Sequence, residues 1–284
     1  RYMLDFEVLD DKILAPDAFN KGQYMLKELS FLTFPAHGET DFSKFDIPFL
    51  CVGTDLATGE ATIFEEGELS GALRASLAFP SMFSPFKING RKYVDGGVVN
   101  NLPIAILKEN KGMDFVIASN VQGRLYTEDE LVSVIQILEQ VSSYTNAIAY
   151  QEQKGKASLI INPPVLSYSL TAYDQSDTIL KLGYAEAMKY EAVFKKLPQK
   201  TEDRDTVVDL RKEKDFYINS VEVSGVDQTT ARFVKSKMRL KKPSLYTPKK
   251  LNAGLDRLYG SSYYDYLYFD MIPADTGYTL IIKL

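Results

Sequence analysis

The stretch NGRKYVDGGVVNNLP, residues 89–103, constrains the fold more than any other part of the sequence. Asn89-Gly90 is the dipeptide preferred in two-residue turns, so residues 86–88 and 91–94 are expected to pair as an antiparallel hairpin. Asp95 then ends a strand, and Gly96-Gly97 permit backbone angles or close approaches that larger residues do not. On these residues alone, a hairpin, a loop and a helix with a capping aspartate explain the stretch as well as a catalytic aspartate does.

Composition narrows the class of protein. The chain has 284 residues, a net charge of -5 and 45% hydrophobic residues, as expected for one large or two ordinary globular domains and not for a nucleic-acid-binding protein. No apolar run is long enough to span a bilayer, and the first residues do not resemble a signal peptide. His37 is the only histidine and Cys51 the only cysteine, which excludes an internal disulfide, a His-rich metal site and any catalytic triad without His37. We expect neither a metal nor an organic cofactor.

Helical and strand patterns alternate from residue 1 to about 198, which predicts an α/β domain over residues 1–198. Strands are expected at residues 48–56, 60–67, 115–120 and 158–164, and helices at residues 69–79, after Pro103 and at 177–197. A capping box at residues 127–130 is expected to open a further long helix. Its apolar face would carry Leu131, Val134, Ile135, Leu138 and Val141.

A second, smaller domain is expected at the C-terminus. Residues 199–215 are mostly charged and form the candidate linker. Residues 216–284 read as strand, helix, helix, strand and strand, a β-α-α-β-β unit large enough to fold alone. We therefore expect the two domains to be separate compact bodies.

Two stretches between residues 46 and 103, FDIPFLCVGTDLATGE and ALRASLAFPSMFSPFKINGRKYVDGGVVNNLP, resemble the bacterial patatin-like phospholipases. The resemblance implies a three-layer α/β fold and a Ser–Asp dyad whose aspartate is Asp95, with Gly96 and Gly97 as its supporting loop. The tail resembles a POTRA domain in VEVSGV, TPKKLNAGLDRLY and TGYTLIIKL. Patatin followed by POTRA is similar to a bacterial arrangement that continues into an outer-membrane β-barrel.

The sequence departs from the patatin-like pattern in one respect. That family carries a glycine-rich oxyanion loop and a Gly-x-Ser-x-Gly nucleophile, and residues 1–284 contain no Gly-x-Ser-x-Gly. We expect the nucleophile segment to precede Arg1, which leaves this chain inactive alone and with an apolar face that favours self-association. In a dyad the aspartate activates the serine directly, so Asp95 would be the base and no histidine is needed.

Other residues have competing interpretations. Phe79, Met82, Phe83 and Phe86 are candidates for an acyl pocket or for ordinary core. Asp55 is expected to be a turn residue, and His37 a surface loop residue. Arg74 could orient Asp95 or a loop carbonyl, or form a structural salt bridge, which is the preferred interpretation. The basic residues 232–250 could contact anionic lipid headgroups or simply be a solvated helix face.

The leading hypothesis is a lipid acyl hydrolase of the bacterial envelope that acts on phospholipid or other acyl-ester lipids and associates with an outer-membrane barrel. The alternative is a non-catalytic envelope scaffold whose POTRA domain binds peptides by strand addition. An intact Asp-Gly-Gly at residues 95–97 favours the enzyme, because a scaffold has no need of that aspartate. The envelope location rests on the POTRA resemblance.

Overall fold

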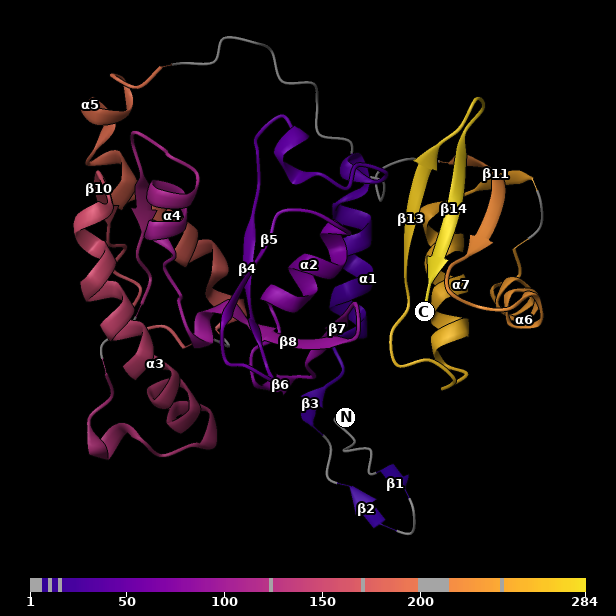
Figure 1. The fold of residues 1–284 in the computed structure, drawn as a ribbon, viewed down its shortest axis with the longest axis horizontal. Coiled ribbons are helices and arrows are strands. Elements are labelled where there is room, and N and C mark those ends of the chain that lie inside the picture. Colours follow the sequence, from indigo (N-terminus) through magenta and orange to yellow (C-terminus); the bar gives the residue numbers. More distant parts are fainter. Residues whose placement is uncertain are drawn as a thin grey trace. The chain divides into compact units, whose positions relative to one another are not determined.

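The structure is a computed structural model that describes residues 7–9, 12–14, 17–122, 125–169, 172–198, 215–240 and 243–284 (Figure 1). The chain divides into two compact units, one formed by Arg1–Asp95 with Asp205–Leu284 and the other by Gly96–Arg204. Residues 199–214 of the expected linker lie outside the described residues. The boundaries 1–198 and 216–284 remain predictions about the domains, whereas the compact units group the first 95 residues with the C-terminal part.

A four-stranded antiparallel sheet with the order β5-β4-β8-β7 lies at the centre of the first unit. Its strands are β4 (Cys51–Asp55), β5 (Ala61–Phe64), β7 (Phe86–Ile88) and β8 (Arg91–Asp95). The predicted hairpin is confirmed: Asn89 and Gly90 have φ of 49° and 84°, the positive values that this two-residue turn requires. A shorter parallel pair joins β3 (Ala18–Asn20) to β6 (Ser81–Phe83). Another hairpin, β1 (Glu7–Leu9) with β2 (Lys12–Leu14), precedes them.

Helix α2 (Leu69–Ser76) packs on this sheet, and helix α1 (Gln23–Leu32) packs against α2. The sequence of α2 is rich in small residues, and a side chain at Gly71 would meet the Phe86 ring at 3.4 Å, so the helix and sheet lie close together. The shared core is apolar and consists of Leu26, Phe42, Phe64, Ala72, Ala75, Phe86 and Tyr93. Helix α2 thus confirms the helix predicted at residues 69–79, apart from its last residues.

The C-terminal part of the same unit is an α+β layer with the sheet order β12-β11-β14-β13. Its elements in chain order are β11 (Phe216–Val223), α6 (Gln228–Met238), β12 (Ser244–Tyr246), α7 (Pro248–Tyr259), β13 (Tyr268–Pro273) and β14 (Tyr278–Lys283). Strands β11 and β14 are parallel, and the other neighbours are antiparallel. The predicted β-α-α-β-β order is observed with one addition, the three-residue strand β12.

Helix α1 contributes to two cores. Leu26 points into the core under the first sheet, while Phe31 joins the core of the C-terminal layer. There the Phe31 ring meets the edge of Phe269 with centroids 4.9 Å apart. Gln23 also holds Leu267 at both backbone groups, accepting from its N–H at 2.9 Å and donating to its carbonyl at 2.5 Å. These contacts explain why the N-terminal and C-terminal segments form one compact unit.

His37 belongs to the same junction, and the prediction that it is a surface loop residue is wrong. Its side chain is 3% exposed, and Nδ1 accepts a hydrogen bond from the Met271 N–H at 2.9 Å. Burial lowers the pKa of His37, and the nearby carboxylate of Asp270 offsets part of that effect. The sequence gives no local signal for this burial, because Met271 and Asp270, which approach the two ring nitrogens, lie more than 230 residues away.

Lys283 anchors a buried ionic cluster beside His37. Its ammonium group, 13% exposed, binds the carboxylate of Asp270 at 2.5 Å and that of Glu68 at the start of α2. The hydroxyl of Tyr268 donates to the second oxygen of Glu68. Two carboxylates around one ammonium group compensate its burial, so the cluster links α2 to the C-terminal strands.

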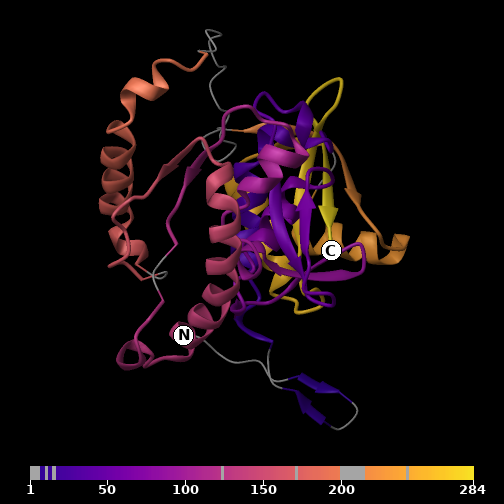
Figure 2. The same cartoon turned by 60° about the vertical axis from the view of Figure 1, so that its left-hand side comes forward.

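The second unit contains a parallel strand pair, β9 (Ile117–Ser119) and β10 (Leu159–Ile161), at the two expected strands. Figure 2 shows the long helix α3 (Val134–Gln153) of this unit. The helix begins at an N-cap serine, Ser133. The predicted capping box at residues 127–130 is present, but it closes a 3-10 turn, Glu128–Glu130, and not α3. The helix predicted at 177–197 is split into α4 (Ser176–Met188) and α5 (Glu191–Phe194). The helical segment after Pro103 ends as a π-helix, Ile106–Asn110.

The structure describes only some of the residues of the apolar face predicted for α3. Val134 and Val141 are 67% and 60% exposed, so they do not form core within this unit, and Leu131 precedes the helix. The side chains of Ile135 and Leu138 lie outside the description. The buried core of this unit is instead formed by Ile104, Val116 and Ala118.

Candidate functional site

Asp95 is the last residue of β8, and its backbone is held from two directions. Its N–H donates to the Ala78 carbonyl at 3.0 Å, just after α2. Its carbonyl accepts from the hydroxyl of Thr54 on β4 at 2.9 Å, and it lies opposite Gly53 in the β4–β8 register. The side chain of Asp95 is half-buried. The sheet therefore fixes the backbone of Asp95 and so the point from which its carboxylate side chain extends.

The glycine loop that follows is held by amide side chains of α3. Gly96–Val98 forms a 3-10 turn in which the Gly96 carbonyl accepts from the N–H groups of Val99 and Asn100, at 3.2 and 3.0 Å. Neither glycine has a positive φ, so a left-handed backbone is not the reason for glycine here. The buried Asn146 donates to the Gly97 carbonyl and accepts from the Asn101 N–H at 2.9 Å.

A second amide on the same helix completes this clamp. Gln153 accepts from the Ala105 N–H at 3.0 Å and donates to the Asn100 side chain at 3.1 Å. Asn146 and Gln153 are each only 7% exposed and seven residues apart, so they share one face of α3. Sequence reasoning missed both residues, although two amide side chains seven residues apart on the predicted helix are a signal that could have found them.

One of the roles predicted for Arg74, binding a loop carbonyl, is confirmed, whereas the salt bridge is not found among the described residues. The residue is fully buried, and its Nη2 donates to the backbone carbonyls of Lys21 at 2.7 Å and Ser84 at 2.9 Å. Its guanidinium carbon lies 5.7 Å from the ring centre of Phe83 and 5.6 Å from that of Phe86. Within the described part of the chain Arg74 forms no ion pair, and burial lowers its pKa. Arg74 therefore ties the chain before α1 to the segment between β6 and β7.

This position of Arg74 bears on the candidate acyl-pocket residues. Phe86 is 3% exposed and lies in the core between the sheet and α2. Phe79, Met82 and Phe83 are half-buried on the segment that follows α2. A lipid-binding role for these four side chains remains a prediction, and Phe83 and Phe86 already have a structural role as the aromatic walls around Arg74.

Asp55 is a structural residue, as predicted. Its carboxylate is buried and accepts from the N–H groups of Ala57 at 2.9 Å and Thr58 at 3.4 Å, which closes the turn between β4 and β5. Arg91 also donates to it at 2.8 Å. The Ala57 hydrogen bond, followed by that from Arg91, lowers the pKa of Asp55. Asp55 is thus committed to holding the hairpin that ends at Asp95.

We searched the described residues for a metal-binding cluster and for a membrane-spanning helix. No group of three or more His, Cys, Asp or Glu side chains in these ranges is arranged to hold a metal ion. No helix in the same ranges combines the length and the apolar character needed to cross a bilayer. The thiol of Cys51 is half-buried, and burial raises its pKa to about 12, which keeps it protonated and poorly nucleophilic.

Comparison with known proteins identifies both parts of the chain. Residues 2–108 match the family model of the patatin-like phospholipases, and residues 216–279 match the POTRA model, described as a surface antigen variable number repeat. The chain contains a patatin-like phospholipase domain followed by a POTRA domain. The matched patatin region includes Asp95 and the two strands β7 and β8 that carry the hairpin.

Several of the relatives found among curated proteins are named as NTE family proteins. An NTE family protein of Mycobacterium bovis, named as uncharacterized, is 35% identical over 86 residues, which cover 30% of this chain and 24% of that protein. Another from Mycobacterium tuberculosis is 39% identical over 99 residues, 35% of this chain and 16% of the relative. A lysophospholipase of Emericella nidulans is 23% identical over 234 residues, 72% of this chain and 15% of the relative. The chain thus spans about a quarter or less of the length of these relatives.

Proposed function

We propose that this patatin–POTRA chain is part of a lipid acyl hydrolase that uses a Ser–Asp dyad with Asp95 as the base. The observation that carries the proposal is the placement of Asp95 within the matched patatin region, at the end of a strand whose backbone is fixed on both sides. Family membership and the lysophospholipase relatives support lipid hydrolysis at a coarse level. The Ser–Asp dyad with Asp95 as its base is our proposal beyond that general assignment.

In the proposed mechanism a serine hydroxyl attacks the ester carbonyl while the Asp95 carboxylate takes its proton. The proton then passes to the oxygen of the departing alcohol, and an acyl-serine remains. Water attacks that ester and gives a proton to Asp95. Asp95 returns this proton to the serine oxygen as the fatty acid leaves, which restores the free serine and the carboxylate. In this proposal the serine lies outside residues 1–284, which contain no Gly-x-Ser-x-Gly. Backbone N–H donors for the oxyanion would come from the same segment.

The geometry of this chain serves such a base in a specific way. An aspartate that accepts a proton directly has to meet the serine oxygen at hydrogen-bonding distance, so small displacements are costly. The β4 and α2 contacts fix the backbone before the loop. The buried amides of Asn146 and Gln153 fix the loop after Asp95. We therefore assign Asn146 and Gln153 as positioning residues for the Asp-Gly-Gly loop.

The test is hydrolysis of a lysophospholipid by the full-length protein, with the fatty acid released as the readout. Asp95→Asn removes the base but keeps the shape, and we expect kcat to fall by about 10²–10⁴-fold, the usual contribution of a general base. Asp46→Asn, an exposed carboxylate in the same matched region, is the matched control and should leave kcat unchanged. Full activity of Asp95→Asn would refute the dyad.

The substrate class and location belong to the same proposal. Lysophospholipid is the first substrate to test because two relatives carry the name lysophospholipase. The POTRA domain supports association with an outer-membrane barrel, and hence a place in the bacterial cell envelope. If the full-length protein hydrolysed no acyl ester but bound extended peptides, the alternative of a non-catalytic envelope scaffold would replace the hydrolase.

A further inference from the structure

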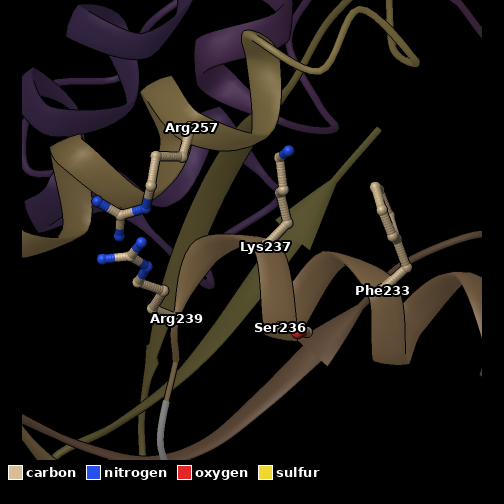
Figure 3. A pocket seen from close by; sticks show the side chains of 5 residues that line it. All are labelled: Phe233, Ser236, Lys237, Arg239 and Arg257. Atoms are coloured by element: carbon tan, nitrogen blue, oxygen red, sulfur yellow. The ribbon is translucent and has the colours of Figure 1, made fainter.

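A pocket of about 340 Å³ opens at the C-terminal end of α6, away from every residue of the proposed dyad (Figure 3). Phe233, Ser236 and Lys237 line it from one face of α6, because residues three and four apart are neighbours on a helix. Arg239 follows as the C-cap residue in the left-handed conformation, with φ 57° and ψ 40°. Arg257 reaches the pocket from α7.

Close packing of the two helices brings the arginines together. A side chain at Gly254 would lie 3.1 Å from the Met238 carbonyl, so glycine lets α7 pass near the end of α6. One turn later Arg257 donates Nη2 to the same carbonyl at 2.9 Å. Figure 3 shows the guanidinium groups of Arg239 and Arg257 turned toward one another in the pocket.

The charges around this pocket are unbalanced. In the described part of the chain neither Lys237 nor Arg239 takes part in an ion pair, whereas Lys27 and Lys283 elsewhere in the unit are paired with carboxylates. Residues 232–250 contain eight Lys and Arg and no Asp or Glu, in a chain of net charge -5. Favourable interaction with the helix C-terminus explains one such cation, as for Arg257 on the Met238 carbonyl. It does not explain three cations around one pocket.

We propose that this pocket binds a phosphate-bearing anion. Two guanidinium groups offer paired N–H donors that match phosphate oxygens, and Lys237 adds a compact charge. Ser236 lines the same pocket, and its side chain carries a further O–H donor. This proposal does not depend on the hydrolase assignment, because the pocket shares no residue with the Asp95 loop.

The rim favours the phosphate of an anionic phospholipid over a soluble one. Phe233 is 38% exposed, and its ring meets the edge of Tyr263 at 5.5 Å between centroids. Tyr263 is itself 73% exposed. Aromatic side chains beside cations suit the interfacial region of a membrane, where the ring is partly apolar and the cation meets the headgroup. The site would thus hold this face against an anionic bilayer.

The experiment is sedimentation of the 284-residue chain with vesicles of phosphatidylcholine alone or mixed with phosphatidylglycerol in equal parts. The test variant is Lys237→Gln with Arg239→Gln, and the control is Lys249→Gln with Lys250→Gln. Both remove two exposed cations from residues 232–250, so net charge is matched. Titration calorimetry with inorganic phosphate and with glycerol phosphate forms the soluble arm, and circular dichroism checks folding.

We expect the wild-type chain to bind only the mixed vesicles, and the test variant to bind them roughly thirtyfold more weakly, from about fivefold per cation near an anionic surface. The control should lose clearly less. Binding of a soluble phosphate that the test variant loses would support the phosphate site with a soluble ligand as its source. Equal losses in the two variants would show diffuse attraction and overturn the pocket, as would the absence of binding to every probe.

Discussion

Replacing Phe31 by alanine tests whether the patatin and POTRA segments share a core in solution. Phe31 is 2% exposed on α1, and its ring contacts Phe269 in the POTRA core at 4.9 Å between centroids. Removing a buried phenylalanine ring costs about 3–5 kcal/mol through lost burial and the cavity that remains. A globular domain is stable by only about 5–15 kcal/mol, so Phe31→Ala should remove a large share of the stability of the first unit.

The assay is urea unfolding of the 284-residue chain, followed by circular dichroism and by tyrosine fluorescence, since the chain has 18 Tyr and no Trp. Leu32→Ala is the matched control, because Leu32 is the next residue of α1 and is 51% exposed. Its effect should stay within about 0.5 kcal/mol. If Phe31→Ala cost no more than Leu32→Ala, the POTRA segment would fold without α1, and the separate bodies expected from the sequence would be correct.

Two further predictions concern the same unit. His37 is buried and its pKa is lowered, so at acid pH the unfolded chain binds a proton more readily than the folded chain does. The free energy of unfolding should therefore fall as the pH drops below about 6.5, by at most about 1.4 kcal/mol per pH unit. Asp270 and Lys283 are the charged groups that face the His37 ring. In urea unfolding, the stability of the His37→Gln variant should depend less steeply on pH. An unchanged slope of stability against pH would show that other groups cause the pH dependence. Gly22→Ala should cost about 1–3 kcal/mol more than Gly59→Ala. Both glycines have positive φ, of 76° and 72°, but only at Gly22 would the new carbon lie 2.5 Å from Arg74. Equal losses of stability in thermal unfolding would mean that the Arg74 side chain moves aside.

Several elements followed from the sequence because their causes are local. The β7–β8 hairpin depends on Asn89-Gly90, which adopts the turn with little help from the rest of the fold. Helix α7 begins where Thr247 caps the Lys250 N–H and Pro248 occupies the first turn. Asp55 was predicted as a turn residue because it ends a strand, and its carboxylate accepts from two N–H groups within three residues. Asp95 was singled out from the order of residues around it.

The start of α3 shows where local signals mislead. A capping box at residues 127–130 satisfies the same N–H groups in a 3-10 turn as in an α-helix, so it does not specify how far the helix continues. Ser133 supplies the actual N-cap. Likewise, the apolar spacing of the predicted face did not reveal that buried amides, Asn146 and Gln153, make the contacts that matter for the Asp-Gly-Gly loop.

The sequence by itself determined the hairpin, the main helices and the position of the candidate base, because turn and cap preferences act over a few residues. Tertiary structure alone decided that His37 is buried, which backbone carbonyls Arg74 binds, and that α1 contributes to two cores. Each of these depends on a partner far along the chain, such as Met271 for His37. A buried polar group takes whichever partner the packed chain places beside it, and apolar residues carry no mark of which core they join.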